Sequence, residues 1–301
     1  MSSTTFTEIT EPFLRFARSQ RPQIDEALER LTHYDGDCPD VLREAIRYSL
    51  LAPGKRLRPI LVLMAAESCG SDPRRAMPAA CAVEMIHAYS LVHDDLPSMD
   101  DDRLRRGRPT CHVRYGESLA ILVGDALLAQ AFEVLSAGIT PPARALACCR
   151  QLASAAGPCS LVGGQVDDLR ASSMAMGPAE LERIHRRKTG ALFRASLQLG
   201  GIVAGASPSE QEALTSYGEH VGLAFQILDD LLDIWGNPTS LGKSAGKDAA
   251  QGKPTYPALL GEAASAGRAE QLLAEARGAV DGLKHAERLC ALTWYVLQRD
   301  H

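Results

Sequence analysis

The sequence predicts an all-α fold in a single domain. Along most of the chain, apolar residues recur with the roughly 3.6-residue period of a helix, and convincing two-residue alternation is scarce. Many of these stretches are rich in alanine and leucine and are apolar on most faces, as core helices are. No long linker, repeat or low-complexity segment divides the chain, so residues 1–301 are expected to form one helical domain.

The predicted helices are separated by breaks that contain glycine or proline, the residues that most often end regular structure. They cover residues 60–69, 78–96, 117–137, 143–156, 179–205, 209–234, 254–264 and 268–282. Ser209 and Glu212 have the spacing of a capping box at the start of one helix. The segment 236–253 is long for a loop and rich in glycine, serine and lysine, which favours a flap that folds over an anion. The alternative is a mobile surface loop.

Composition excludes several classes of function. Apolar residues make up 46% of the chain and charged residues 23%, the ordinary usage of a globular protein. The net charge of -5, without a basic stripe interleaved with aromatic residues, argues against nucleic-acid binding. The 8 cysteines include no C-x-x-C pair, so neither a zinc site nor a disulfide framework is predicted. Reduced thiols are the simpler interpretation, and they favour the cytoplasm.

Neither a signal peptide nor a membrane span is predicted. The N-terminus lacks a basic flank followed by an apolar core. The most apolar segment, residues 119–135, carries Asp125 and Glu133, and it falls short of the roughly 18 uninterrupted apolar residues that a span needs. A buried helix is therefore expected there.

Two aspartate-rich clusters indicate the chemistry. Asp94-Asp95 is followed by Asp100, Asp101 and Asp102, and Asp229-Asp230 is followed by Asp233. Basic residues come after each cluster: Arg103, Arg105, Arg106 and Arg108 after the first, and Lys243, Lys247 and Lys253 after the second. Carboxylates alone would repel a phosphate, but Mg²⁺ commonly joins one or two carboxylates to substrate phosphates. The pattern therefore favours metal bridging to a phosphorylated substrate over a solvated acidic turn or a Ca²⁺ site.

Spacing predicts how the carboxylates are arranged. Asp229 and Asp233 share one face of a helix about 6 Å apart along its axis, with Gln226 roughly on that face and Asp230 pointing elsewhere. On an ideal helix Asp94 and Asp100 would point about 240° apart. Pro97 must bend the chain between them, and the bend can return Asp100 to the metal that Asp94 faces.

Further candidates lie outside the clusters. Lys55, Arg56 and Arg58 precede an apolar helix, and exposed N–H groups at a helix start also favour anions. His87 lies two turns before Asp94 on much the same face, which favours a ligand-facing role over that of a core histidine. Lys188 ends a basic run that could otherwise be a solvated helix face.

These residues stand in motifs that resemble those of a known family. LVHDDLPSMDDDRLRRGRPTCH, GKRLRP, FQILDDLLD and GKPTYPALLG are similar to motifs of the all-α trans-prenyl diphosphate synthases, and the resemblance is closest to bacterial-type farnesyl diphosphate synthases. It runs in register from about residue 42 to residue 260. The resemblance implies long helices around a central substrate cavity, the isoprenoid synthase type of fold, and a homodimer.

The resemblance also implies roles for individual residues. Two or three Mg²⁺ ions, or Mn²⁺ in their place, would be held by the aspartates Asp94, Asp95, Asp100, Asp229 and Asp233. The allylic diphosphate would meet Arg105, Lys188, Lys243 and Lys253, and the diphosphate of isopentenyl diphosphate would meet Lys55, Arg58, His87 and Arg106. Thr189 and Gln226 would lie near the reacting carbons and, with Lys188 and Arg105, would act in catalysis.

The implied reaction is the head-to-tail condensation of isopentenyl diphosphate with dimethylallyl or geranyl diphosphate, giving farnesyl diphosphate and pyrophosphate. Tyr89, with Ser90 beside it, would limit product length below Asp94, and a core tyrosine is the alternative. Other candidate functions are a geranyl or geranylgeranyl diphosphate synthase, a terpene cyclase and a non-catalytic partner of an active synthase. A plain acidic, metal-binding helical protein is a further alternative.

Overall fold

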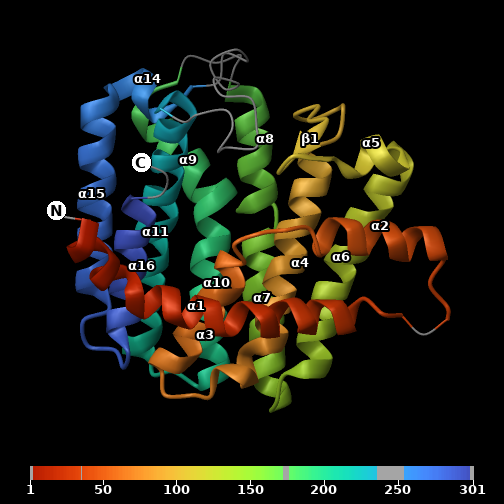
Figure 1. The fold of residues 1–301 in the computed structure, drawn as a ribbon, viewed down its shortest axis with the longest axis horizontal. Coiled ribbons are helices and arrows are strands. Elements are labelled where there is room, and N and C mark those ends of the chain that lie inside the picture. The colour runs from red at the N-terminus through yellow and green to blue at the C-terminus, as the bar shows by residue number, and fades with distance from the viewer. Residues whose placement is uncertain (1–2, 35, 172–175, 236–253, 299–301) are drawn as a thin grey trace.

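The computed structural model describes residues 3–34, 36–171, 176–235 and 254–298, and it confirms the predicted all-α fold (Figure 1). One short antiparallel hairpin, β1 (Leu104–Arg105) and β2 (Arg108–Pro109), is the only sheet among these residues. The helices are α1 (Ser3–Leu31), α2 (Asp40–Leu50), α3 (Leu57–Ser68), α4 (Met77–Asp94), α5 (Cys111–Tyr115), α6 (Glu117–Gly138), α7 (Pro142–Ala156), α8 (Leu161–Ala171), α9 (Pro178–His185), α10 (Ala191–Ala204), α11 (Pro208–Trp235), α14 (Tyr256–Leu260), α15 (Glu262–Ala279) and α16 (Ala286–Leu297). Two short segments have other helix types: the 3-10 helix η1 (Pro73–Ala76) and the π-helix η2 (Arg186–Gly190).

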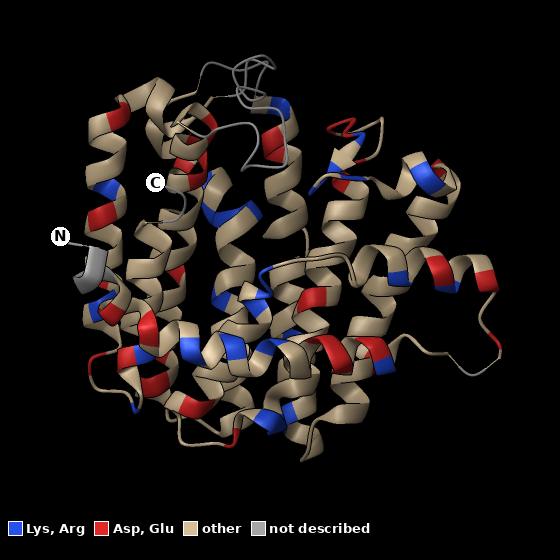
Figure 2. Ribbon diagram, in the orientation of Figure 1, with Lys and Arg blue, Asp and Glu red and all other residues tan. Residues whose placement is uncertain are grey.

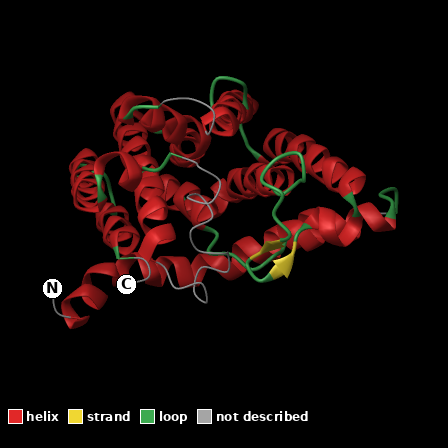
Figure 3. Cartoon of the chain, turned by 90° about the horizontal axis from the view of Figure 1, so that it is seen from above, coloured by secondary structure: helices red, strands yellow, loops and turns green. Residues whose placement is uncertain are grey.

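Helix α10 lies at the centre of the bundle. It packs against α3, α4, α7 and α11, while α4 packs on α6 and α11 packs on α15. Helix α1 crosses in front of these upright helices and packs against α16, so the first and last helices are in contact (Figure 1). Seen from above, the helices surround the middle of the molecule (Figure 3).

The core helices are those that are apolar on most faces. Residues 60–66 of α3 are all buried, and so are residues 79–86 of α4, which include the acidic Glu84. Such helices gain stability from burial on every side, at about 25 cal/mol per Å² of apolar surface. One hydrophobic cluster runs from α1 to α16 through them.

Several expected boundaries are wrong. The helix predicted over 179–205 is interrupted by η2, and the one predicted over 254–264 ends at Leu260, because α15 begins after the left-handed Gly261 (φ +83°). The capping box at the start of α11 uses Ser207 and Glu210: the Ser207 amide donates to Glu210 Oε2 (2.7 Å), and the Glu210 amide donates to Ser207 Oγ (3.3 Å). Helices α1, α2, α5, α8 and α16 were not predicted.

Helix α6 covers the most apolar stretch of the chain. Among the described residues it is the one helix long and apolar enough to cross a membrane by length and composition, a test that core helices also pass. Its inner face packs on α4 and contains the buried polar side chain of Gln130. Gln130 donates to the carbonyl of Leu31 (2.6 Å) and accepts from the hydroxyl of Tyr34 (2.5 Å), so α6 is tied to the chain beyond α1 as part of the bundle.

Candidate active site

The first aspartate cluster folds back on itself at the end of α4. The helix ends at Asp94, and the amide of Asp100 donates to the Asp94 carbonyl at 2.9 Å, so the predicted bend around Pro97 is present and brings these two residues together. Burial raises the pKa of Asp94 to about 6, and the charges of Asp100 and Asp95 add to the shift, although Lys188 and Arg105 oppose it. Closely spaced carboxylates at this end of α4 therefore favour the approach of a cation.

Asp95 does not share the exposure of its neighbours. It is only 4% exposed, and it accepts a bidentate ion pair from Arg105, with Nε–Oδ1, Nε–Oδ2 and Nη2–Oδ1 distances of 2.8, 3.0 and 2.6 Å. Burial lowers the pKa of Arg105, but its hydrogen bonds to Asp95 and the charges of Asp95, Asp102 and Asp94 together outweigh burial, so the net shift is upward. Asp95 therefore anchors the arginine of the β1–β2 hairpin beside Asp94.

The π-helix η2 places Lys188 beside the same cluster. Lys188 Nζ donates to Asp168 Oδ2 on α8 at 2.7 Å, and the carboxylates of Asp168 and Asp94 raise its pKa against the opposing effect of burial. The helices on either side come very close to η2 through glycines. A Cβ on Gly164 of α8 would lie 2.4 Å from the backbone nitrogen of Lys188, and one on Gly222 of α11 would lie 2.8 Å from Gly190 Cα.

A cavity of about 760 Å³ brings most of the predicted substrate-binding residues together. The residues predicted from the sequence that line it are Lys55, Arg58, His87, Arg105, Arg106, Thr189, Gln226 and Asp229. Asp229 and Arg105 line this cavity, and Arg105 lies close enough to influence Asp94. The aspartates of the first cluster do not line it themselves, so this cluster lies beside the cavity, behind Arg105. Acidic and basic residues gather at this end of α4, α8 and α11 (Figure 2).

One part of the cavity wall is suited to an anion that is not bound to metal. Arg58 stacks on Phe193, with the guanidinium carbon 4.8 Å from the ring centroid, and its Nη1 lies 3.3 Å from His87 Nε2. Among the described residues, Arg58 Nε has no hydrogen-bond partner. Burial lowers the pKa of Arg58 to about 10, and burial with the nearby Arg58 charge lowers the pKa of His87 well below its ordinary value. Arg58 is therefore charged and His87 neutral near pH 7.

Arg56 and Arg106 hold this wall in place from behind. Arg56 has left-handed backbone (φ 50°) and is buried, and it donates to Asp25 Oδ1 and Glu84 Oε1, both at 2.8 Å. Arg106 Nη1 donates to the carbonyl of Pro53 at 2.6 Å. The same guanidinium nitrogen would lie 2.5 Å from a Cβ on residue 54, which is Gly. The basic loop before α3 is thus clamped between α1, α4 and the hairpin.

The structure does not bring every predicted residue to the cavity wall. The predicted residues that do not line it are Asp94, Asp95, Asp100, Lys188, Asp233, Tyr89 and Ser90. Ser90 donates instead to the carbonyl of His87 (2.9 Å). Tyr89 is buried with its ring edge-on to His93, 5.9 Å between centroids, and Asp94 contributes to raising its pKa. Lys243 and Lys253, with the predicted flap at 236–253, lie outside the described residues.

The carboxylates of the site are suited to magnesium ions that are bound jointly by the protein and a substrate diphosphate. Within the part of the chain that the structure describes, no group of three or more His, Cys, Asp or Glu side chains is close enough to hold a metal ion alone. Mg²⁺ rarely occupies such a cage, since it keeps waters and is bound by one or two carboxylates with substrate phosphates. Asp94, Asp100 and Asp229 offer the hard oxygen ligands that this requires, from α4 and α11.

Some residues of the site were missed by sequence reasoning. Asp168 and Glu84 accept hydrogen bonds from Lys188 and Arg56. Glu84 stands alone in an apolar helical stretch, which was an available signal because a buried carboxylate requires a partner. Asp168, which stands beside Asp167, gave no such signal. Arg18 and Arg21, which also line the cavity, lie on a helix that was not predicted.

Comparisons with known proteins agree with this geometry. The polyprenyl synthetase family matches residues 39–289. The chain is 42% identical over 295 residues to a farnesyl diphosphate synthase from Geobacillus stearothermophilus, with 95% of this chain and 98% of that protein covered. It is 48% identical over 269 residues to geranylgeranyl pyrophosphate synthase 11, chloroplastic, from Arabidopsis thaliana, covering 87% and 75%. The crystal structure of an FPP/GFPP synthase from Zymomonas mobilis superposes with a TM-score of 0.84 at 34% identity, covering 97% of this chain and 99% of that one.

Proposed function

Because the chain belongs to the polyprenyl synthetase family, which condenses prenyl diphosphates head to tail, we propose that it makes farnesyl diphosphate. Its substrates would be isopentenyl diphosphate with dimethylallyl and then geranyl diphosphate. The observation that carries the proposal is the cavity in which Asp229 meets a wall of basic side chains. One of these side chains, Arg105, is bound to Asp95 of the first cluster. One diphosphate can be bound with metal beside Asp94, and the other without metal beside Arg58.

Different residues of the site would bind the two diphosphates. Lys188 and Arg105, each held by a carboxylate, lie beside Asp94 and would bind the allylic diphosphate. The second diphosphate would be bound by the basic residues of the other wall, Lys55, Arg58 and Arg106, with neutral His87 among them. With these roles, the two diphosphate groups would lie on separate walls of the site, with the isoprenoid carbons between them.

The reaction follows from this arrangement. When the allylic C–O bond ionises, negative charge builds on the departing diphosphate, and the fixed charges of Lys188 and Arg105 stabilise it. Magnesium, held by Asp94, Asp100 and Asp229 with Asp233 assisting, would supply further positive charge to that leaving group. The isopentenyl double bond attacks the allylic cation and leaves a new cation on the isopentenyl unit. The carbon beside that cation loses a proton to the released pyrophosphate, and the electrons of the broken C–H bond form the new double bond. Thr189 and Gln226 line the cavity where the cation would form.

A geranylgeranyl product is the second candidate, because plant geranylgeranyl pyrophosphate synthases are about as similar to this chain as the bacterial farnesyl diphosphate synthase. Tyr89 favours the shorter product: a bulky ring is buried one turn and a half below Asp94, close enough to be influenced by that carboxylate. An aromatic residue there would block a tail growing past it.

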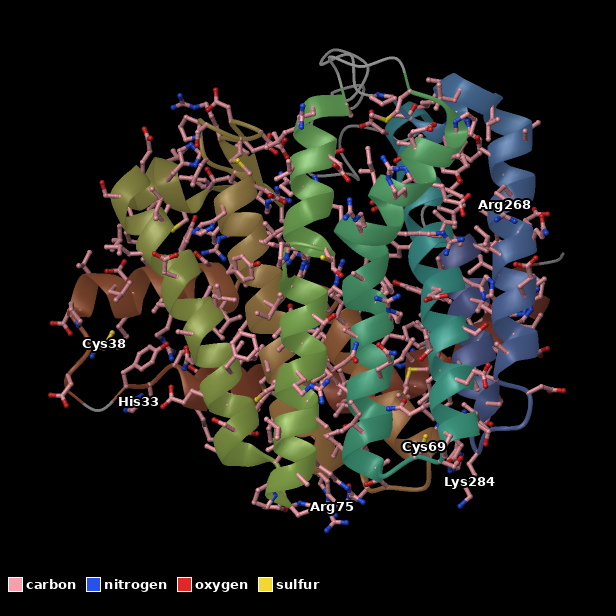
Figure 4. All side chains as sticks on the ribbon, turned by 180° about the vertical axis from the view of Figure 1, so that it is seen from behind. His33, Cys38, Cys69, Arg75, Arg268 and Lys284 are labelled. Atoms are coloured by element: carbon pink, nitrogen blue, oxygen red, sulfur yellow. The ribbon has the colours of Figure 1, made fainter. Side chains whose placement is uncertain are left out.

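We also propose that two copies form a homodimer. Apolar side chains are exposed on three helices of one face, namely Ile121 and Leu122 on α6, Leu146 on α7, and Val162 and Val166 on α8. On the rear of the molecule α6 lies beside α7, and α8 continues above α7 (Figure 4). Burying such a face against a second copy would remove it from water. Light scattering at micromolar concentration is expected to give twice the mass of the chain, and the mass of one chain would contradict the dimer.

The product assay tests the activity directly. The protein is incubated with labelled isopentenyl diphosphate, dimethylallyl diphosphate and Mg²⁺, and the products are separated by chromatography after dephosphorylation. A fifteen-carbon product is expected. A twenty-carbon product would instead support the geranylgeranyl alternative, and the absence of any prenyl product would refute the proposal.

A further inference from the structure

A chain of hydrogen bonds runs from the second aspartate cluster into the cavity. Asp230 is 4% exposed, and its Oδ1 accepts from Gln226 Nε2 at 3.0 Å. Gln226 Oε1 accepts in turn from the hydroxyl of Thr189 at 2.8 Å. Thr189 and Gln226 line the cavity, whereas Asp230 does not. The buried aspartate is therefore connected to the reaction space only through two side chains that are themselves in it.

The direction of every bond in this chain follows from Asp230. A carboxylate only accepts hydrogen bonds, so the amide nitrogen of Gln226 must face it. The amide oxygen of Gln226 then faces Thr189, and the threonine hydroxyl must donate. With its proton committed to Gln226, Thr189 Oγ1 can present only lone pairs to the cavity. An oxygen fixed in that state is suited to stabilise positive charge on a nearby carbon.

Asp230 is itself held by groups that come from two other segments. Its Oδ2 accepts from the backbone amide of Tyr256 at 3.0 Å and lies 3.2 Å from His185 Nε2. The ring of His185 stacks on that of Tyr256, with centroids 5.7 Å apart and planes at 22°. A backbone amide can only donate, so it fixes which oxygen of Asp230 is available to Gln226.

We propose that Asp230 is a positioning residue, which acts through Gln226 to orient the lone pairs of Thr189 toward the allylic cation, and that it does not bind metal. The inference rests on the proposed prenyl transfer. The proposal gives different roles to two adjacent aspartates of one motif: Asp229 lines the cavity, whereas Asp230 is buried behind the cavity wall. The two residues should therefore differ in what their removal does to the enzyme.

The test compares D230N, T189V and the D230N/T189V double variant with D229N. In D230N the Tyr256 amide still requires an acceptor, so the new NH₂ faces Gln226. The Gln226 amide then turns over and points its own NH₂ at Thr189. We expect kcat to fall roughly 10- to 100-fold, as small losses of alignment do, while KM for both diphosphates stays within about twofold. The Mg²⁺ concentration for half-maximal rate should be unchanged in D230N and raised in D229N.

The double variant provides the sharpest comparison, because Asp230 and Thr189 act through one path. D230N/T189V should be no slower than the slower single variant, whereas independent roles would multiply the two losses. Multiplied losses, or a raised Mg²⁺ requirement in D230N, would overturn the proposal. T189S, which keeps the hydroxyl, should retain more of the wild-type kcat than T189V.

Two further measurements keep the outcome clear. Thermal unfolding shows whether D230N is folded; if it is not, Q226L breaks the same link, because leucine can neither donate to Asp230 nor accept from Thr189. Q226L should show at least the same loss of kcat with the same Mg²⁺ requirement as wild type. A folded D230N with wild-type kcat would refute the positioning role alone, whereas wild-type protein without prenyl product would refute the function on which it rests.

Discussion

Asp95 and Asp168 are acids that serve the site by holding cations in place. Each is bonded to a basic side chain, Arg105 or Lys188, which it orients beside Asp94. An unanchored lysine or arginine would lose side-chain entropy on binding a diphosphate, roughly 1.5–2 kcal/mol for each residue. Anchoring removes part of that loss before the substrate arrives.

Tyr89 is the residue on which product length is expected to depend. Replacing it with alanine removes the buried ring below Asp94 and leaves room for a longer tail. Y89A is therefore expected to shift the main product from fifteen to twenty carbons, as measured by chromatography. Y89F keeps the ring and is the matched control, for which the product should stay at fifteen carbons. An unchanged product from Y89A would show that the ring is only a core residue.

His87 should make stability depend on pH. Burial and Arg58 lower its pKa in the folded protein, whereas the unfolded chain takes up the proton near the ordinary value of about 6.5. As the pH falls below that value, the unfolded state binds more protons, so the folded state loses stability by up to about 1.4 kcal/mol per pH unit.

The measurement is urea unfolding of wild type and H87Q at about pH 8 and about pH 5.5. Subtracting H87Q removes the contributions of other groups, including Asp94, whose raised pKa acts in the opposite direction. Wild type should lose more stability than H87Q on acidification. Equal losses would mean that His87 is not held neutral.

At the scale of elements, the π-helix η2 is the feature that places Lys188 and Thr189 in the site. Its neighbours approach it through Gly164 and Gly222, where a Cβ would collide with the backbone of η2. A widened turn of helix has poorer internal hydrogen-bond geometry than an α-helix, and such turns are frequent at functional sites. The close packing of α8 and α11 keeps η2 in place.

Substituting Gly164 should disturb both stability and activity. A methyl group 2.4 Å from the backbone nitrogen of Lys188 would push α8 away and displace Lys188 from Asp94. Such overpacking lowers the free energy of unfolding by about 1–3 kcal/mol. We expect G164A to lower both the free energy of unfolding and kcat. The matched control is G267A on the exposed face of α15, where nothing lies within 4 Å of an added Cβ. G267A should gain about 0.5–1 kcal/mol with no change in kcat. Wild-type kcat in G164A would show that η2 needs no such support.

The sequence predicted elements best where burial is uniform. Helices α3, α4, α6 and α10 are strongly apolar, and their periodicity survives any error in boundaries. The missed helices are amphipathic or contain breakers: α1 includes Pro12 and Pro22, and α8 contains Gly163-Gly164. Tertiary packing overrides such local signals. The π-helix could not be predicted, because one extra residue in a turn leaves no trace in a hydrophobic pattern.

At the scale of the whole molecule, the sequence predicted the composition of the site better than its internal connections. Most predicted substrate-binding residues with described positions line one cavity. The partners that hold them, such as Glu84 for Arg56 and Asp168 for Lys188, come from distant segments. Such pairs depend on how helices pack, which periodicity along one helix does not reveal. The single-domain organisation and the homodimer stay predictions.

The proposed catalysis depends on two acidic clusters, one at the end of α4 and one on α11, that act together on one diphosphate. Because Mg²⁺ is commonly bound by one or two carboxylates together with substrate phosphates, the loss of either cluster should be as severe as the loss of both. D94A and D229A are expected to lower kcat by at least about 100-fold each, without unfolding the protein. D281A, at an exposed aspartate outside the cavity lining, is the matched control.

Turnover of isopentenyl and dimethylallyl diphosphate, measured for these four proteins with Mg²⁺ and with chelator, is the most direct test. Wild type and D281A should turn over with Mg²⁺ and stop with chelator, while D94A and D229A should keep at most about one hundredth of the wild-type rate with Mg²⁺. Wild-type turnover that persists in chelator, or a near-wild-type rate in D94A or D229A, would contradict a catalytic role for the two clusters.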